Sequence, residues 1–495
     1  MAGTNDSMFS RRGFMKTSAA ALGVTTVGLA EAQEETTRPN FLIIVTDQQN
    51  IDTITALKSH YEDPAWGCHW VNTPNLDRLM ARGVAFTESH SANPVCCPAR
   101  SAIFTGRMSI ETGLIYNNIG IDKNVPNMGQ WLEEHSDYAR VYCGKWHAGG
   151  QWNYPEVTGP RKVPGFETLP VGACDTGDAA DYQVSSAVEG FVRGYTEAAP
   201  FVIVAGLMNP HDICFWPDWG NDKITSAPTD TFGLGDALPP VPPNNSYDFQ
   251  EPKGGPYTKF NAMQWRNYAY DYYRMIEKID GDVGRMLDAV ESRDDDTVII
   301  FTADHGEGLG RHSRVSKWHP YDHSVKVPFI ISCPRLMSEN VIDTDHLVSG
   351  VDVMATVCDY AGVPQPPHCR GRSLRPLVTG EESPAWREHV YAEMQHTGRM
   401  IRTKQYKFVK FYQFSREQDK PFLLADGTAT QFVPGHGADY QEIPVRLLFD
   451  MENDPWETKN LWDDPQYADV LAEHERILRE EYEAKLIPGT HFDRN

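Results

Sequence analysis

Three runs of apolar, β-prone residues constrain the fold of this chain more than any other feature. They are residues 40–46 (NFLIIVT), 201–207 (FVIVAGL) and 297–302 (TVIIFT). Continuous apolar runs are typical of strands that are buried on both faces, as at the centre of a parallel sheet. Before the third run, apolar residues recur at helical spacing across 275–290 and predict an amphipathic helix. Strands that alternate with helices predict an α/β fold with a doubly wound, mostly parallel sheet.

Polar residues follow each of these three predicted strands. Asp47 follows the first, Asn209-Pro210-His211 follows the second, and Asp304 follows the third. Ligands of open α/β sheets bind beyond the carboxyl ends of the strands. The sequence therefore predicts a functional site that these segments share.

Beyond about residue 370 the pattern changes. Short β-prone runs occur at 400–403, 406–411 and 447–450, and a helical pattern covers about 468–485. We interpret 33–370 as the catalytic α/β domain and 371–495 as a smaller α+β domain with an antiparallel sheet. The segment 212–260, rich in Pro, Gly, Asn and Asp, predicts a long loop that shapes selectivity.

The N-terminus has the pattern of an export signal. Residues 10–16 (SRRGFMK) match the twin-arginine motif, an apolar run follows, and Ala30-Glu31-Ala32 is a cleavage site. Residues 1–32 therefore predict export from a bacterial cytoplasm, to the periplasm or beyond, by the twin-arginine translocase. The apolar run is shorter than the roughly 20 residues that span a bilayer, so an integral membrane protein is not expected. The net charge of −23 disfavours nucleic acid as a partner.

A cysteine motif indicates the chemistry. Residues 96–100 (CCPAR) and then Thr105-Gly106 fit C-x-P-x-R followed by T-G, and here the chain resembles the sulfatase family. The resemblance implies an alkaline-phosphatase-like fold and a dedicated maturation enzyme that oxidises Cys96 to formylglycine. The hydrated aldehyde would be the nucleophile, and Arg100 would hold it. Cys97 occupies the variable position of the motif.

The same resemblance implies a divalent metal held by Asp47, Gln48, Asp304, His305 and the side chain of residue 96. Two carboxylates at strand ends repel each other unless a cation lies between them. Either aspartate alone could instead cap a helix. Gln48 and His305 depart from the commonest family pattern and lower the charge of the site. Ca²⁺ is the family's usual metal, with Mn²⁺ and Mg²⁺ as alternatives.

Further motifs complete the resemblance. Residues 144–147 (GKWH) match the family's G-K-W-H, which implies that Lys145 binds the sulfate and that His147 acts as a base on the hydrated aldehyde. His211 would protonate the leaving alcohol, and Lys317 would be a second sulfate-binding lysine. Three more histidines near Lys317 either line the pocket or lie in a polar loop: His312, His319 and His323.

These features together predict an exported sulfatase that hydrolyses a sulfate ester. A saccharide ester is expected from family association alone. Two alternatives stay open at this point. Gln48 and His305 also resemble phosphonate monoester hydrolases, so a phosphonate monoester or phosphodiester hydrolase with the same nucleophile is the first. The second is a non-catalytic protein that binds sulfated glycans.

Overall fold

The structure is a computed structural model. It describes residues 38–117, 120–149, 163–169, 171, 176–218, 223–224, 235–245, 260–293, 295–380, 385–394, 398–414, 422–423, 429–430 and 440–486. The predicted export signal at 1–32 and most of the predicted loop at 212–260 lie outside these residues. The described residues belong to one compact unit that begins at Arg38. The predicted domain boundary at residue 370 therefore stays a prediction.

The main sheet has eight strands among the described residues, in the order β11-β2-β10-β9-β1-β6-β4-β5. The three apolar runs form its centre, where β1 pairs in parallel with both β6 and β9. β10 runs antiparallel to its neighbours β9 and β2, which the sequence analysis did not foresee. The strands are β1 (Asn40–Asp47), β2 (Gly83–Phe86), β4 (Ala139–Gly144), β5 (Glu167–Thr168), β6 (Phe201–Pro210), β9 (Thr297–Ala303), β10 (Phe329–Ser332) and β11 (Val341–Asp343).

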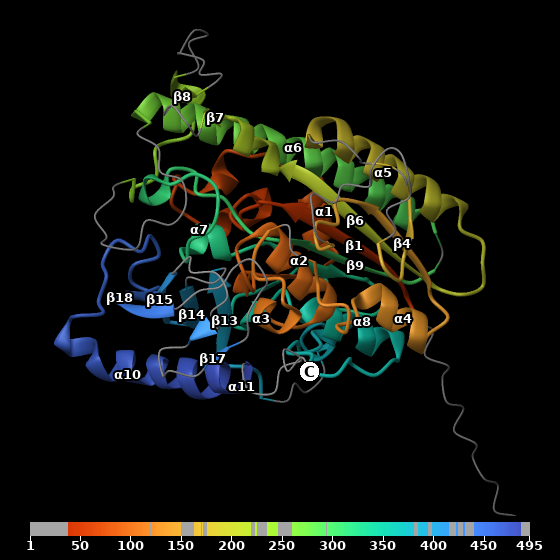
Figure 1. Cartoon of the computed structure of the whole chain (residues 1–495). Coiled ribbons are helices and arrows are strands. Elements are labelled where there is room, and N and C mark those ends of the chain that lie inside the picture. Colours follow the sequence, from red (N-terminus) through yellow and green to blue (C-terminus); the bar gives the residue numbers. More distant parts are fainter. Residues whose placement is uncertain are drawn as a thin grey trace, which may run out of the picture. The chain divides into compact units, whose positions relative to one another are not determined.

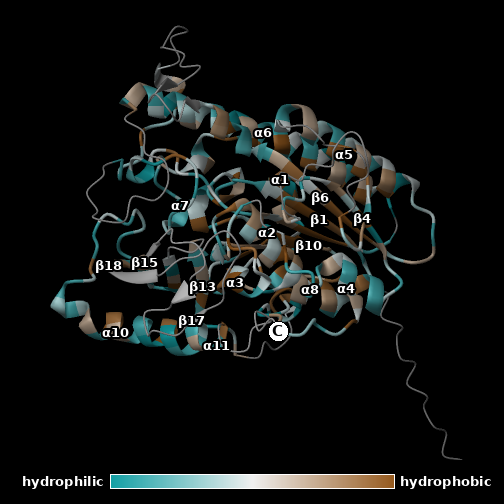
Figure 2. Ribbon diagram, in the orientation of Figure 1, coloured by the Kyte–Doolittle hydropathy of each residue, from teal (hydrophilic) through white to brown (hydrophobic). Residues whose placement is uncertain are grey.

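Helices cover both faces of this sheet (Figure 1). One hydrophobic core packs the sheet against α1 (Pro74–Ala81), α5 (Gly177–Gly194) and α6 (Ala262–Glu291). A second core lies on the other face, and Figure 2 shows hydrophobic residues concentrated in the central strands between the two helix layers. The helices of the second face include α2 (Cys96–Thr105), α4 (Met128–His135), α8 (Asp352–Ala361) and α9 (Arg375–Thr379). The doubly wound architecture is confirmed.

The strand register places the polar residues of the sheet's carboxyl edge side by side. Asp47 pairs with Pro210 of β6, and Thr46 pairs with Ala303 of β9 immediately before Asp304. On the far side of β6, β4 ends at Gly144, which lies opposite Gly206. Gly144 has φ of 86°, and a Cβ there would lie 2.1 Å from the Gly206 carbonyl oxygen. Only glycine fits this turn, which brings the chain after β4 to the edge of the sheet.

The C-terminal part contains the predicted antiparallel sheet, which is confirmed. Its strands are β13 (His389–Met394), β14 (Gly398–Thr403), β15 (Tyr406–Phe414) and β18 (Tyr440–Asp450), in that order. The predicted terminal helix is present as α10 (Ala468–Ile477), which continues through a π-helical turn, Leu478–Glu483, into α11 (Ala484–Leu486). Ile477 and Leu478 pack against Phe408 and Leu448 of the sheet in one apolar cluster.

No described helix has both the length and the apolar composition needed to cross a bilayer. The eight cysteines within the described residues are free thiols.

Short helices and strands complete the described structure. They are α3 (Ser109–Thr112), α7 (Asp322–Val325), β3 (Ser89–His90), β7 (Pro217–Asp218), β8 (Lys223–Ile224), β12 (Val348–Ser349), β16 (Phe422–Leu423) and β17 (Ala429–Thr430).

Candidate active site

Cys96 is the first residue of α2 and is almost fully buried. Its sulfur lies 3.1 Å from the Lys317 Nζ, 3.3 Å from the His305 Nε2 and 3.8 Å from the Asp47 Oδ1. Burial and Asp47 raise the pKa of the thiol, but Lys317, Lys145 and His305 outweigh them and hold that pKa well below its usual range. The site therefore stabilises negative charge on the side chain of residue 96.

Within the described residues, one group of side chains could hold a metal ion. It consists of Asp47, Cys96, Asp304 and His305, whose candidate ligand atoms all lie within 4.8 Å of one another. Burial and the neighbouring Asp47 raise the pKa of Asp304 to about 7. Burial also raises the pKa of Asp47, but Lys145, His211, Lys317 and His305 together hold it well below its usual range. Two buried carboxylates beside an imidazole suit a divalent cation, so these residues fit the predicted metal.

Arg100 lies one helical turn after Cys96 and bridges the carboxylates of Asp47 and Asp304. Its Nε donates to the Asp304 Oδ2 at 2.9 Å, and its second guanidinium nitrogen donates to the Asp47 Oδ2 at 3.4 Å. Its remaining nitrogen donates to the Lys145 carbonyl at 2.8 Å. Because the guanidinium is fully buried and planar, it fixes three segments relative to one another.

Gln48 lies beside this group with its side chain turned toward Lys317. Its Oε1 accepts a hydrogen bond from the Lys317 Nζ at 2.7 Å, while its Nε2 donates to the Glu307 Oε2 at 2.5 Å. Its backbone N–H donates to the Asp304 Oδ1 at 3.1 Å. In this arrangement the amide positions Lys317. The assignment of Gln48 as a metal ligand stays a prediction.

The other predicted residues reach the same place. The Lys145 Nζ forms an ion pair with the Asp47 Oδ2 at 2.6 Å. His147 and His211 lie close enough to Cys96 for the thiol to contribute to the pKa of each imidazole. Burial, together with Lys317 and Lys145, lowers the pKa of His211 to about 4, so its imidazole is neutral at pH 7. The structure thus brings all the predicted catalytic and metal residues into one buried cluster, while their roles stay predictions.

Glu307 is a site residue to which the sequence analysis gave no role. It is fully buried and accepts hydrogen bonds from the Tyr268 hydroxyl at 2.9 Å, from the Ser316 N–H and from Gln48. The available signal was the polar run Asp304-His305-Gly306-Glu307 at the end of a buried strand. Its partner Tyr268 belongs to α6, and nothing in the sequence links the two.

Asp181 of α5 is a second such residue, and it supports the His211 segment. Its carboxylate accepts the backbone N–H groups of Met208 at 2.6 Å and Asn209 at 2.9 Å. Asp212 accepts two N–H groups at the start of α5, from Gly177 and Asp178. These bonds attach the end of β6 to α5 on both sides of His211.

Asp181 gives a testable pH dependence of stability. Burial raises the pKa of its carboxyl to about 7 from the ordinary 3.8. The folded chain therefore binds this proton more tightly than the unfolded chain. The associated stability is fully present below about pH 4 and is lost as the pH rises through about 7. We expect the melting temperature of the wild type to fall several degrees more than that of Asp181→Asn between about pH 5 and pH 8. Parallel curves from calorimetry would contradict this.

Comparison with known proteins now identifies the family. The sulfatase family model matches residues 39–363, about two thirds of the chain. The chain belongs to the sulfatase family. A second model, for the C-terminal region of N-sulphoglucosamine sulphohydrolase, matches residues 310–426. This sulfatase is therefore a sulfuric ester hydrolase, and the alternative of a non-catalytic binding protein does not hold.

Individual relatives agree with the family model. The sulfatase is 28% identical to the Delta 4,5-hexuronate-2-O-sulfatase of Bacteroides thetaiotaomicron, over 92% of its own length and 91% of the relative's. The solved structure of a 2-O GAG sulfatase superposes with a TM-score of 0.68 at 24% identity, covering 90% of this chain and 92% of that one. The phosphonate monoester hydrolase of Agrobacterium radiobacter superposes with a TM-score of 0.63 at 22% identity, covering 89% and 95%. The two structures support the predicted alkaline-phosphatase-like fold.

Proposed function

We propose that this sulfatase is exported and removes a sulfate group from a saccharide, using formylglycine made from Cys96 and one divalent metal, most simply Ca²⁺. The observation that carries the proposal is the position of the Cys96 sulfur, which belongs to the metal-capable group and lies 3.1 Å from the Lys317 Nζ. The relative named for a 2-O-sulfated hexuronate supports the saccharide. Residues 10–16 support export by the twin-arginine translocase.

The two groups that would complete the site have defined places. Asp47, Asp304, His305 and the side chain of residue 96 would hold the metal, with Gln48 beside them. When bound, the metal supplies positive charge to the sulfate oxygens, and the hydrated aldehyde supplies the attacking oxygen. Arg100 keeps the two carboxylates in place for this task.

The two lysines supply fixed positive charge. Lys145 pairs with Asp47 on one side of Cys96, and Lys317 reaches the sulfur with support from Gln48. In the chain with an unmodified Cys96, burial opposes a charged lysine, but Cys96, Cys214 and Asp47 outweigh it and raise the pKa of Lys317. Positive charge that is already oriented toward the transferring group stabilises the transition state without reorganisation.

The two histidines would move protons. His147 is the base that accepts a proton from residue 96, and burial lowers its pKa, which keeps the imidazole neutral and able to accept. His211 is neutral at pH 7 and donates a hydrogen bond to the bridging oxygen as the alcohol leaves. His211 is placed for this by the bonds of Asp181 and Asp212 to the neighbouring backbone.

A substrate panel tests the proposed function. We expect kcat/KM for at least one sulfated mono- or disaccharide to exceed that for an aryl phosphonate monoester by about 10²-fold or more, because sugar hydroxyls contribute binding in the transition state. Sulfate release is measured for 2-O-, 4-O- and 6-O-sulfated sugars, and nitrophenol release for the aryl esters. The sulfatase should be produced together with a maturation enzyme.

A faster reaction with the phosphonate would contradict the proposal. It would favour the phosphonate monoester or phosphodiester hydrolase that Gln48 and His305 suggest. 4-Nitrophenyl sulfate is the internal control, since it tests sulfate transfer without any sugar contact.

A further inference from the structure

His211 marks a side on which the buried reaction centre reaches solvent. Cys96, Lys145 and Lys317 are buried, whereas His211 is partly exposed. His211 is also the residue proposed to donate to the oxygen that joins the sulfate to the leaving alcohol. The alcohol part of the substrate therefore begins at His211 and extends from there toward solvent.

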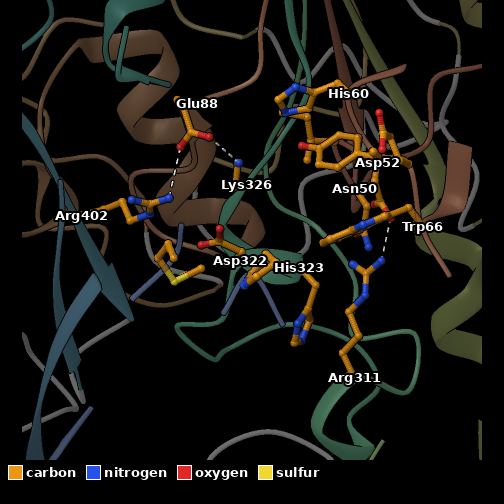
Figure 3. A pocket seen from close by; sticks show the side chains of 15 residues that line it. Asn50, Asp52, His60, Trp66, Glu88, Arg311, Asp322, His323, Lys326 and Arg402 are labelled. Atoms are coloured by element: carbon orange, nitrogen blue, oxygen red, sulfur yellow. Dashed lines mark hydrogen bonds and ion pairs between the residues drawn. The ribbon is translucent and has the colours of Figure 1, made fainter. Parts of the chain in front are cut away.

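A separate pocket of about 280 Å³ does not contain the reaction centre (Figure 3). None of the proposed catalytic or metal residues lines it. Charged groups of its lining pair with one another, since Glu88 lies 2.8 Å from Lys326 and 3.3 Å from Arg402. Such a mixture of paired charges identifies no ligand. The ring of a sulfated sugar is joined to the transferring sulfate, so it must lie beside His211 rather than in this pocket.

Phe215 contacts the His211 ring and is exposed. Both residues belong to the short 3-10 helix His211–Phe215 that follows β6. Their ring centroids are 6.2 Å apart, and the ring planes meet at 75°. The Phe215 side chain is 56% exposed. Single exposed apolar side chains are common on protein surfaces and need no ligand. Phe215 differs from them because it packs on the residue from which the leaving alcohol extends.

The neighbours of Phe215 hold its backbone in place. Ile213 and Trp216 are buried in the hydrophobic core that includes α6. Cys214 turns toward the reaction centre, with its Sγ 3.3 Å from the Gln48 Oε1. Because the residues on both sides are anchored, the Phe215 ring is presented to solvent from a fixed position. A ligand that binds to it has little side-chain freedom to remove.

Trp318 is a second aromatic residue near the same groups. It follows Lys317, whose Nζ lies 5.7 Å from the centroid of the Trp318 ring. Trp318 is partly exposed, and its φ of 77° is a left-handed conformation that bulky residues rarely adopt. Its backbone N–H donates to the Pro94 carbonyl at 3.3 Å, two residues before the reactive cysteine. Such backbone conformations concentrate at functional sites.

Aromatic rings suit one part of a sugar in particular. A pyranose carries hydroxyl groups around its rim and C–H groups on its two faces. The face of an aromatic ring is negative, so it attracts the weakly positive C–H groups while both apolar surfaces leave water. Ligand sites commonly combine such apolar and aromatic surfaces with a few polar groups that fix orientation.

We propose that Phe215 is a sugar-binding residue, whose ring stacks on the pyranose that carries the sulfate ester. The stacked ring would direct the bridging oxygen toward His211 while the buried lysines hold the sulfate. This inference rests on the proposed saccharide function and names the side chain that recognises the sugar itself.

Substitution of Phe215 in the matured, full-length protein tests this proposal. The substrates are D-glucose 6-sulfate, D-galactose 6-sulfate, N-acetyl-D-glucosamine 6-sulfate and a 2-O-sulfated hexuronate, and the one with the highest wild-type kcat/KM is used for every variant. We expect Phe215→Ala to lower this kcat/KM about tenfold or more, because stacking is lost. The inhibition constant of inorganic sulfate should stay the same, since sulfate has no ring. The melting temperature should also stay the same, because the side chain is exposed.

Three further variants separate stacking from other effects. Phe215→Tyr keeps the aromatic face and should retain kcat/KM within about twofold, whereas Phe215→Leu keeps apolar surface alone and should lose about fivefold. Tyr182→Ala is the matched control. Tyr182 of α5 is 58% exposed and lies beside Arg285 of α6, so its removal should leave kcat/KM unchanged.

The outcomes distinguish this inference from the proposed function. Equal kcat/KM in wild type and Phe215→Ala, on a sulfated sugar that is turned over, overturns the role of Phe215 and leaves the proposed function intact. Weaker inhibition by sulfate in Phe215→Ala, in proportion to the loss of kcat/KM, also overturns it, because Phe215 would then support the sulfate site. If matured protein hydrolyses an aryl phosphonate but no sulfated sugar, the proposed function and the role of Phe215 fail together.

Discussion

Cys96→Ser is expected to lower multiple turnover of 4-nitrophenyl sulfate by about 10⁴-fold or more. A serine hydroxyl can accept the sulfuryl group, but it has no second hydroxyl that could expel the group again. Rapid mixing should therefore show at most one equivalent of nitrophenol per protein, followed by almost no steady state. Cys96→Ala should show neither phase, because it has no nucleophile.

Cys97→Ser is the matched control for this result. It makes the same change one residue away, at the variable position of the motif, where Cys97 packs in an apolar cluster. We expect it to keep most of the turnover and to lose some thermal stability, because a hydroxyl replaces a thiol in that cluster. Mass spectrometry of the peptide that contains residue 96 should show an aldehyde in active wild type. Wild-type turnover by Cys96→Ser, or an intact thiol in fully active protein, would exclude formylglycine.

Removal of the divalent metal is expected to have the second large effect. Treatment with EDTA should lower kcat/KM for the aryl sulfate by about 10³-fold, because the ion supplies several kcal/mol of transition-state stabilisation. It should also lower the melting temperature, since an ion at a hundred times its Kd stabilises the fold by about 2.7 kcal/mol. Addition of Ca²⁺, Mn²⁺ or Mg²⁺ singly should restore both properties and rank the metals.

Asp304→Asn should remove the dependence on metal. Burial and Asp47 raise the pKa of this carboxyl, so the folded protein without metal already opposes its charge, and the amide variant should fold. We expect its melting temperature to be the same with and without the ion, and its activity to be as low as that of EDTA-treated wild type. Asp463→Asn, at an exposed turn, is the control and should respond like the wild type. An Asp304→Asn protein that is still stabilised by the ion would place the metal elsewhere.

The central strands and the site residues could be predicted from the sequence because their signals are local. An unbroken apolar run such as 40–46 can only be buried on both faces, and the residue that ends it must lie at the sheet's edge. Asp47 and Asp304 were predicted in this way, and β1 and β9 confirm their positions. Residues 96–100 and 144–147 were recognised from short motifs, and the structure brings both to that edge.

Other parts of the site depend on contacts between distant segments. The fold brings the Gln48 side chain to Lys317 and Glu307, contacts that its place in the sequence does not report, while its assignment to a metal stays a prediction. The support of Glu307 by Tyr268 joins a strand end to the N-terminal part of α6, and no spacing in the sequence reports such a pair. The antiparallel course of β10 was missed for the same reason, since pairing direction is set by neighbours rather than by the strand's own residues.

By itself, the sequence determined which segments are buried, which polar residues end them and which cysteine fits the sulfatase motif. Burial patterns and motifs depend on residues that are neighbours in the sequence. Tertiary structure alone decided what each of those side chains touches. The bond of Asp181 to the backbone at the end of β6 is a product of packing between distant segments. The partners of a buried polar group depend on which surfaces the fold presses together, and the local sequence does not contain that information.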